Sequence, residues 1–399
     1  MIRIIGAGFS GLSLAYFFTK LGYPVTVIEK NSRTGGVISS EYKNNMLIES
    51  AANGFLASEK LEDMFADIGV QALVPKSESR KKYIFRNGLR RWPLSLDETV
   101  VLVGRAVFAF ISGRSKPRED ESLKDWAQRV LGLAGNDYLI QPMVNGIFAQ
   151  KTEILSAKMV LGSMFFKKKR KTLKGLISAP NGMGEVIQKL ESYLKIKGVR
   201  FELSTDEKMH SSVLQHNTFL ATDLFSAKSF FAMSNTKQPE IKKDDLTCLS
   251  LVRVTLNFKN QVNQIDGFGV LFPNKEKFFT LGVLANSKIF ENRGDYNESW
   301  ILGDSVLPDL MNLSDDQIIE KIKQDRLRLF PQAIEIKDVS IHRWKEVVPC
   351  YDHLLQRFLK ENAALTSNLA GNYLGVLGLT GIHERNSQIA SAYAERNKK

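Results

Sequence analysis

The chain has 399 residues and a net charge of +12, from 55 Lys and Arg against 43 Asp and Glu. This length allows two or three domains with cores of their own, and 43% hydrophobic with 25% charged residues excludes a disordered or fibrous chain. The positive charge indicates an acidic partner, such as a carboxylated substrate or anionic lipid, although a merely basic surface explains it too.

Two cysteines, Cys248 and Cys350, lie far apart and exclude a disulfide framework. Because the first predicted strand begins at Met1, we expect no signal or transit peptide, and no run of eighteen apolar residues predicts a membrane span. We therefore expect a cytoplasmic protein, with peripheral contact at the inner membrane face left open.

A glycine-rich turn follows the first predicted strand, over residues 1–5, and opens a predicted helix. A second strand, over residues 24–28, ends at Glu29, eighteen residues after Gly11. This strand–helix–strand pattern is typical of a dinucleotide-binding unit, in which the acid meets the ribose. In it, Gly6 allows the tight turn, Gly8 the approach of a pyrophosphate, and Gly11 close helix packing. The predicted nucleotide-binding residues here are Gly6, Gly8, Phe9, Ser10, Gly11, Glu29 and Lys30.

The segment after Glu29 favours FAD over NAD. It reads E-x-x-x-R-x-G-G, with Arg33 placed to pair with a phosphate and Gly35-Gly36 permitting another close approach of backbone to ligand. It resembles the segment that lies along FAD in flavoproteins of the amine-oxidase superfamily. The alternative is an ordinary surface turn.

Downstream, we expect a helix over residues 60–68 and a basic hairpin around 83–88. Residues 96–175 are predicted to be helical, with an apolar stretch over 100–111 that is too short to span a bilayer. It could rest on a membrane, line a channel, or be a buried core helix. The basic run Lys167–Lys171 indicates either lipid contact or a solvated loop, and we expect no nucleic-acid binding.

The chain then returns to the first domain. A helix over 183–198 with strands over 199–203 and 218–221 continues the α/β pattern. Strands over 249–258, 269–272 and 278–284 predict a second, sheet-based domain, and a last helix is expected from about Ile382.

Seven segments carry a specific resemblance. They are Glu49–Leu56, Tyr83–Leu89, Asp125–Ser156, Asn181–Gly184, Gly267–Gly282, the turn Arg343–His353, and Gly371–Val376. In order and nearly end to end, the chain resembles the FAD-dependent protoporphyrinogen/coproporphyrinogen oxidase family, within the flavin amine-oxidase superfamily.

The resemblance implies an α/β fold with three parts. A discontinuous Rossmann-type FAD-binding domain would comprise residues 1–75, 176–232 and 355–399. A sheet-based α+β substrate domain would comprise 76–95 and 233–354, and 96–175 would form a helical, membrane-associated insertion. By the same resemblance, FAD-binding residues are expected at Gly371, Asn372, Gly375, Val376 and Ile382.

The implied reaction is dehydrogenation of protoporphyrinogen IX to protoporphyrin IX in haem biosynthesis, by hydride transfer to FAD, with oxygen or another acceptor reoxidising the flavin. The resemblance also leaves a homodimer open. We identify no catalytic side chain and expect no metal. The predicted substrate-binding residues are Arg80 and Lys81, which would face the propionates, and Phe268 and Gly269, which would face the macrocycle.

The chain departs from the family pattern at two positions. Ala51-Ala52 replaces a Gly-Pro pair, and Arg385 replaces a glycine near the start of the last helix. Two other functions therefore stay open: another FAD amine or polyene oxidase, and a degenerate, non-catalytic protein that binds flavin or porphyrin.

Overall fold

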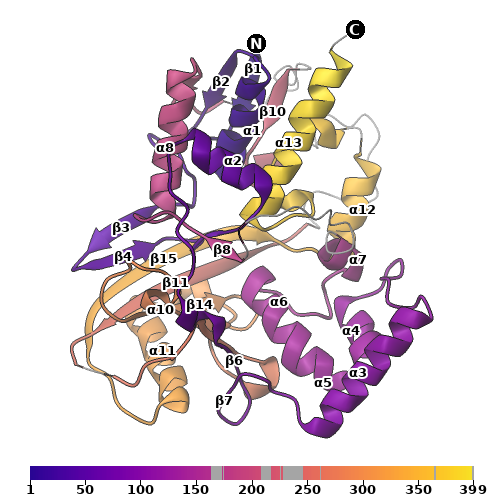
Figure 1. Ribbon diagram of the computed structural model, residues 1–399, viewed down its shortest axis with the longest axis vertical. Coiled ribbons are helices and arrows are strands. Elements are labelled where there is room, and N and C mark those ends of the chain that lie inside the picture. Colours follow the sequence, from indigo (N-terminus) through magenta and orange to yellow (C-terminus); the bar gives the residue numbers. More distant parts are fainter. Residues whose placement is uncertain are drawn as a thin grey trace.

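A computed structural model describes residues 1–162, 173, 175–207, 217–224, 226–227, 246–260, 262–363 and 365–397. Figure 1 shows a small sheet with long helices around it in the upper part of the molecule. A larger sheet lies below it, and a group of helices lies at the lower right.

The upper sheet is parallel, with the strand order β10-β1-β2-β9. Apolar residues dominate β1 and fill much of β2, and most are buried, as expected where helices cover a parallel sheet. The strands are β1 (Ile2–Ile5), β2 (Val25–Ile28), β9 (Arg200–Glu202) and β10 (Thr218–Leu220).

Helices from distant parts of the chain pack around this sheet. In Figure 1, the C-terminal helix α13 lies beside α1, which follows the first strand. This confirms the predicted discontinuous Rossmann-type fold, while the residue boundaries given for the three domains stay predictions. The helices are α1 (Phe9–Lys20), α2 (Glu59–Asp67), α8 (Met183–Ile196) and α13 (Leu379–Arg396).

The lower sheet is mixed, with the strand order β15-β11-β14-β13-β12-β6-β7. Val252, Val254 and Leu256 of β11 pack into a core with Ile318 and Ile322 of α11. The strands are β6 (Lys82–Phe85), β7 (Leu89–Arg90), β11 (Cys248–Phe258), β12 (Gly269–Leu271), β13 (Gly282–Ala285), β14 (Asn297–Gly303) and β15 (Ile336–Pro349).

A buried ion pair attaches α11 (Asp315–Leu329) to this sheet. Arg326 and Glu298 lie 3.0 Å apart with side chains 1% and 0% exposed, and the indole of Trp300 also donates to the carboxylate. Each charge is therefore paired with the other where water does not reach it.

Shorter elements accompany the two sheets. They are the hairpin β3 (Ser40–Lys43) and β4 (Met46–Glu49), the pair β5 (Phe55–Leu56) and β8 (Leu176–Ile177), and the helices α10 (Asn286–Ile289) and α12 (His353–Glu361).

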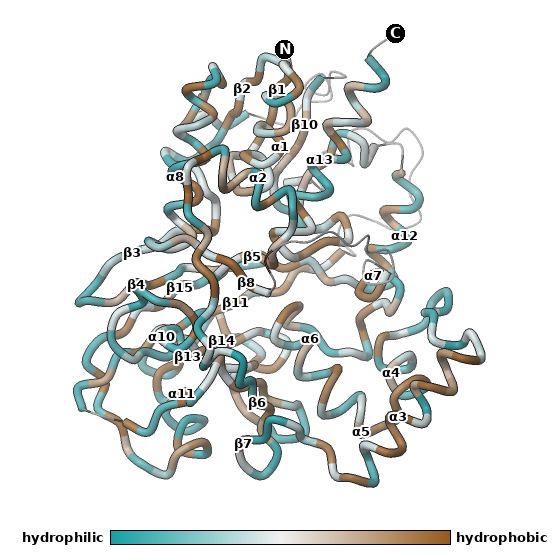
Figure 2. The backbone as a smooth tube through the Cα atoms, viewed as in Figure 1, coloured by the Kyte–Doolittle hydropathy of each residue, from teal (hydrophilic) through white to brown (hydrophobic). Residues whose placement is uncertain are grey.

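The helical insertion begins with a helix that is largely uncovered. Of the sixteen residues of α3, only Ala109 is buried. Figure 2 shows α3 as a mostly hydrophobic stretch at the edge of the molecule, so the alternative of a buried core helix is wrong. The helices are α3 (Leu96–Ile111), α4 (Leu123–Leu131), α5 (Leu133–Gly135), α6 (Gln141–Phe148) and α7 (Ala157–Leu161). The basic run at 167–171 lies outside the described residues.

None of the helices in the described part of the chain combines the length and the apolar character needed to cross a bilayer.

Three secondary-structure predictions were wrong in detail. Arg343 and Trp344 lie within the long strand β15, not in a turn, because β15 pairs with β11 along most of its length. The strand expected over 278–284 is confined to Gly282–Ala285, and the last helix begins at Leu379 rather than Ile382.

Candidate functional site

The glycine-rich turn lies between β1 and α1, as predicted. Gly6 has φ +102°, and a Cβ there would lie 2.6 Å from the carbonyl oxygen of Ala221. A Cβ on Gly11 would lie 1.9 Å from the carbonyl oxygen of Gly6. The chain itself therefore requires these two glycines: one for the turn and one for helix packing.

Gly8 is different, because no contact with the described residues requires it to be glycine. Its φ is −66°, and the nearest atom to a Cβ added there would be the Cα of Gly36, at 4.0 Å. Gly8 forms an isolated parallel bridge with Gly35, so the two glycine segments predicted to meet the cofactor lie side by side. An open space beside Gly8 is what close approach of a pyrophosphate needs.

The first turn of α1 offers its positive end to a ligand. No side chain caps the helix at Gly8, and no acid lies in its first turn. Several buried polar atoms near this end and along the C-terminal segment have no partner in the described structure. They are Ser10 Oγ, Thr222 Oγ1, Tyr373 Oη, Arg385 Nε and Asn386 Oδ1. Orphaned buried polar atoms of this kind are expected where a polar ligand binds.

Two of the residues predicted to contact the ribose and phosphates form hydrogen bonds with the backbone of this chain. The Glu29 carboxylate is 8% exposed and accepts from the amides of Ala7 and Asn31, at 2.8 and 2.9 Å. Arg33 donates to the carbonyls of Thr34 and Gly36, and Lys30 is exposed. Their contacts to a nucleotide stay predictions.

The C-terminal residues predicted to bind the cofactor come to the same place. The Ala370 amide donates to Leu220 at the end of β10, which brings Gly371 beside Thr222. Asn386 of α13 donates to the carbonyl of Ser10 at 2.8 Å. The remaining members of this group are the half-buried Asn372, Gly375 and Val376 and the buried Ile382.

The segment of residues 50–56 lies at the centre of these elements. The Ser50 hydroxyl donates to the carbonyl of Val37, just after Gly36. The rings of Phe55 and Phe9 lie 5.1 Å apart, and Thr380 donates to the carbonyl of Leu56 at 2.7 Å. The sequence indicated this segment through its resemblance to the family over Glu49–Leu56 and its Ala51-Ala52 departure, but not its contacts with both sheets.

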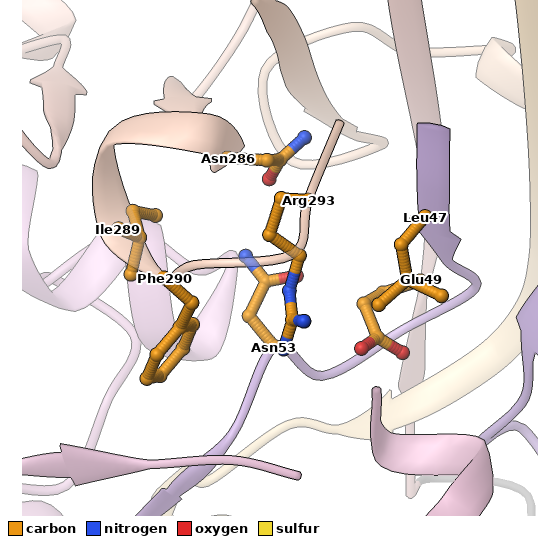
Figure 3. A pocket seen from close by; sticks show the side chains of 7 residues that line it. All are labelled: Leu47, Glu49, Asn53, Asn286, Ile289, Phe290 and Arg293. Carbon is orange, nitrogen blue, oxygen red and sulfur yellow. The ribbon is translucent and has the colours of Figure 1, made fainter. Parts of the chain in front are cut away.

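A small cavity of about 10 Å³ lies beside this segment (Figure 3). Glu49, Asn53 and Arg293 contribute polar groups to it, while Leu47, Asn286, Ile289 and Phe290 complete its wall. Burial raises the pKa of Glu49, although its carboxylate accepts from Ser40 Oγ and the Met183 amide. A space of this size holds about one water molecule.

The predicted substrate-binding residues lie on the other sheet, where β6 pairs with β12. Lys81 pairs with Asp266 at 2.5 Å, and both side chains are substantially exposed. A Cβ on Gly269 would lie 2.1 Å from the carbonyl oxygen of Val283, so strand packing explains this glycine. Phe268 lies beneath the ammonium group of Lys82, at 5.2 Å, and Arg80 is exposed. Substrate roles for these residues stay predictions.

Fold and site together define a dinucleotide-binding protein with the architecture of the flavin amine oxidases. A family profile described as NAD(P)-binding Rossmann-like domain matches residues 4–68. Cyclohexylamine oxidase from Brevibacterium oxydans shares the fold, with a TM-score of 0.72, 15% identity and coverage of 100% of this chain and 99% of that one.

More specific relatives are porphyrinogen oxidases. Protoporphyrinogen oxidase 2 of Arabidopsis thaliana is 26% identical, with 95% of this chain and 90% of the relative covered. Coproporphyrinogen III oxidase of Bacillus subtilis is 23% identical, with 96% and 94% covered. The predicted resemblance to this family is confirmed, and so are the predictions of an oxidoreductase and of FAD as its cofactor. The open space at Gly8 and the orphaned polar atoms fit that cofactor.

We expect Gly8→Ala to separate FAD binding from folding. The new Cβ meets no protein atom closer than 4.0 Å, so the apoprotein should keep its stability to within about 1 kcal/mol. FAD affinity, measured by flavin fluorescence titration, should fall at least about tenfold because the methyl group takes the space of the pyrophosphate. Gly11→Ala is the control and should unfold the protein directly. Unchanged FAD affinity in Gly8→Ala would contradict this site.

His383 ties the start of α13 to α1 and α2. Its ring is fully buried, with Nδ1 2.8 Å from Ser13 Oγ and Nε2 3.2 Å from the carbonyl oxygen of Lys60. Because a carbonyl only accepts, Nε2 carries a proton, and in the neutral imidazole Nδ1 then accepts from Ser13. Burial lowers the pKa of His383 to about 4.

This arrangement predicts a pH-dependent stability. Between pH 6.5 and about 4 the unfolded chain takes up a proton at this position and the folded chain does not. His383 therefore stabilises the fold fully above pH 6.5, and this contribution falls by roughly 1.4 kcal/mol per pH unit on acidification. Urea unfolding of wild type and His383→Gln across this range should give a free-energy difference that shrinks as pH falls. Parallel curves would contradict the assignment.

Proposed function

We propose that this FAD-dependent oxidoreductase dehydrogenates a porphyrinogen, with protoporphyrinogen IX as substrate. The observation that carries the proposal is similarity to protoporphyrinogen and coproporphyrinogen oxidases along 95–96% of the chain. The joined site supports it, because the fingerprint glycines, residues 50–56 and the start of α13 are in mutual contact.

In this proposal, bound FAD supplies a hydride acceptor, which is the hard chemistry of the reaction. The chain's own residues bind and orient. The first turn of α1 and Arg33 would face the phosphates, and Glu29 the ribose. Arg80 and Lys81 would face the substrate propionates, with Phe268 and Gly269 against the macrocycle. For Lys81, the carboxylate of a propionate would have to replace that of Asp266.

Anaerobic mixing of the FAD-loaded protein with protoporphyrinogen IX tests this reaction. We expect bleaching of the oxidised-flavin band, appearance of porphyrin bands, and recovery of the flavin when air is admitted. Recovery would also identify oxygen as a competent acceptor.

The same measurement separates the other functions. Bleaching by coproporphyrinogen III alone would identify the macrocycle with four propionates as substrate. Bleaching only by amines would assign the protein to the amine oxidases. If the protein shows no band of bound flavin after incubation with FAD and removal of the free cofactor, a non-catalytic carrier would be favoured.

We further propose that α3 rests on an anionic membrane surface. Leu96, Val100, Val103, Val107 and Phe110 form an exposed stripe at helical spacing, each between 51% and 88% exposed. Exposed cations flank both ends of the helix, and Trp92 is 51% exposed beside the first pair. The cations are Arg90 and Arg91 before the helix and Arg114, Lys116 and Arg118 after it. Apolar side chains bordered by cations and an aromatic ring match an interface of lipid tails and anionic headgroups. The predicted cytoplasmic location and contact with the inner membrane face belong to this proposal.

Replacing Val100, Val107 and Phe110 together by Ser should weaken binding to phosphatidylcholine–phosphatidylglycerol vesicles at least about tenfold, since each buried side chain contributes about 1.5–3 kcal/mol. Flotation measures the bound fraction. Ile196→Ser changes a residue that is 83% exposed on another helix and serves as the control.

Equal flotation of wild type and the triple variant would overturn the membrane proposal. Concentration-dependent association without lipid, abolished in the triple variant, would instead assign the stripe to a homodimer.

A further inference from the structure

Arg253 is a buried cation in strand β11, whose other residues are apolar or polar without charge. It lies in β11, where Val252 and Val254 on either side face the core under α11, so Arg253 points to the opposite face. Arg253 as a whole is 4% exposed. Among the described residues, no ion pair includes it, in contrast to the buried Arg326, which is paired with Glu298.

Within the part of the chain that the structure describes, the guanidinium donates to neutral groups only. One terminal nitrogen donates to the carbonyl of Ala51, and the other donates to Asn53 Oδ1 at 2.8 Å and Ser299 Oγ at 3.0 Å. Nε is buried and has no partner among the described residues. Burial lowers the pKa of Arg253 to about 10, which still leaves it charged at neutral pH.

The nearby acid Glu49 does not neutralise this charge by direct contact. Its carboxylate accepts from Ser40 and from the Met183 amide, on the side facing α8. In Figure 3, Asn53 and Arg293 lie between Glu49 and Phe290, which forms part of the cavity wall. Arg253 therefore carries its charge in a region of low dielectric constant with no carboxylate of the described residues at ion-pair distance, and Glu49 attracts it only from further away.

The position of this charge relates it to the cofactor. Arg253 holds the backbone at Ala51 and the side chain of Asn53, within the 50–56 segment that contacts Val37, Phe9 and Thr380. Those three residues belong to the elements that form the candidate FAD site. The charge is thus fixed to the segment around which the site is built.

We propose that Arg253 is a positioning residue that stabilises the negative charge which bound FAD acquires on reduction. Hydride transfer brings two electrons and one proton to the flavin, so the neutral oxidised ring becomes a monoanion, while the substrate loses the same hydride. A fixed cation in a dry site favours that anion without reorganisation of water. The inference rests on the proposed function only in requiring that FAD binds here, and it is independent of the substrate.

Sulfite is a direct probe, because it adds to oxidised flavin and leaves a negative charge on the ring. We expect Arg253→Met to lower the sulfite affinity of the FAD-loaded protein at least about tenfold. The affinity is measured from the loss of the oxidised-flavin band as sulfite is added. The midpoint potential of the flavin should fall by about 30 mV or more, which is tenfold for a two-electron couple. Arg253→Lys should stay close to wild type.

Two further variants separate charge from packing. Arg253→Gln keeps donors for Ala51 and Asn53 without the charge and should behave like Arg253→Met, so it also serves if the Met variant does not fold. Ser299→Ala removes a neutral partner of the guanidinium on β14, outside the candidate FAD site, but keeps the charge and should leave sulfite affinity and potential unchanged.

Equal sulfite affinity and potential in wild type and the uncharged variants would overturn the inference and leave Arg253 a structural tie. A shift as large in Ser299→Ala as in Arg253→Gln would do the same. A protein that responds to sulfite as expected but oxidises no porphyrinogen would refute the proposed substrate and leave the role of Arg253 standing.

Discussion

One short segment, residues 50–56, joins the two halves of the molecule, because side chains from both halves hydrogen-bond to its backbone. Trp344 of β15 donates to the carbonyl of Ser50, and Arg253 of β11 donates to that of Ala51. From the other half, Thr380 donates to the carbonyl of Leu56. Such irregular backbone cannot satisfy its polar groups internally, so side chains of both sheets must do so. Any relative movement of the two sheets would break these bonds, and the candidate site is therefore fixed where the sheets meet.

Two buried arginines in the lower half of the molecule have different surroundings. Glu298 and Arg326 neutralise each other within the core, where either charge without its partner would be strongly unfavourable. Arg253, on the opposite face, has neutral acceptors and an unsatisfied Nε. A core built only for stability would gain from replacing such a residue with an apolar one. Its presence beside residues 50–56 supports the proposal that it acts on bound FAD.

Sequence patterns predicted the upper half well because its constraints are local. The turn at Gly6–Gly11 and the acid at Glu29 lie within one strand–helix–strand unit, so spacing alone places them. The predicted contribution of Ile382 and Gly371 to the same site came only from family resemblance, because contacts between α13 and α1 join the two ends of the chain. Arg253 was missed although a signal existed: a single arginine in the alternating run Val252–Phe258 marks a polar face on a strand. The strand β15 was mistaken for a turn because its pairing partner lies about ninety residues away.

The two departures from the family pattern bear differently on whether the site can work. Ala51 and Ala52 place methyl groups in the 50–56 segment, yet the carbonyl of Ala51 still serves Arg253, so this backbone keeps a defined role. Arg385 donates to the carbonyl of Leu374, which directs part of its guanidinium toward the C-terminal segment. Neither side chain fills the space beside Gly8, whose nearest neighbour is backbone of Gly36. A site that had lost its ligand would be under no constraint to keep glycine there, since the backbone conformation of Gly8 suits any residue. Its openness, with orphaned polar atoms around it, favours a functional flavin site over a degenerate one.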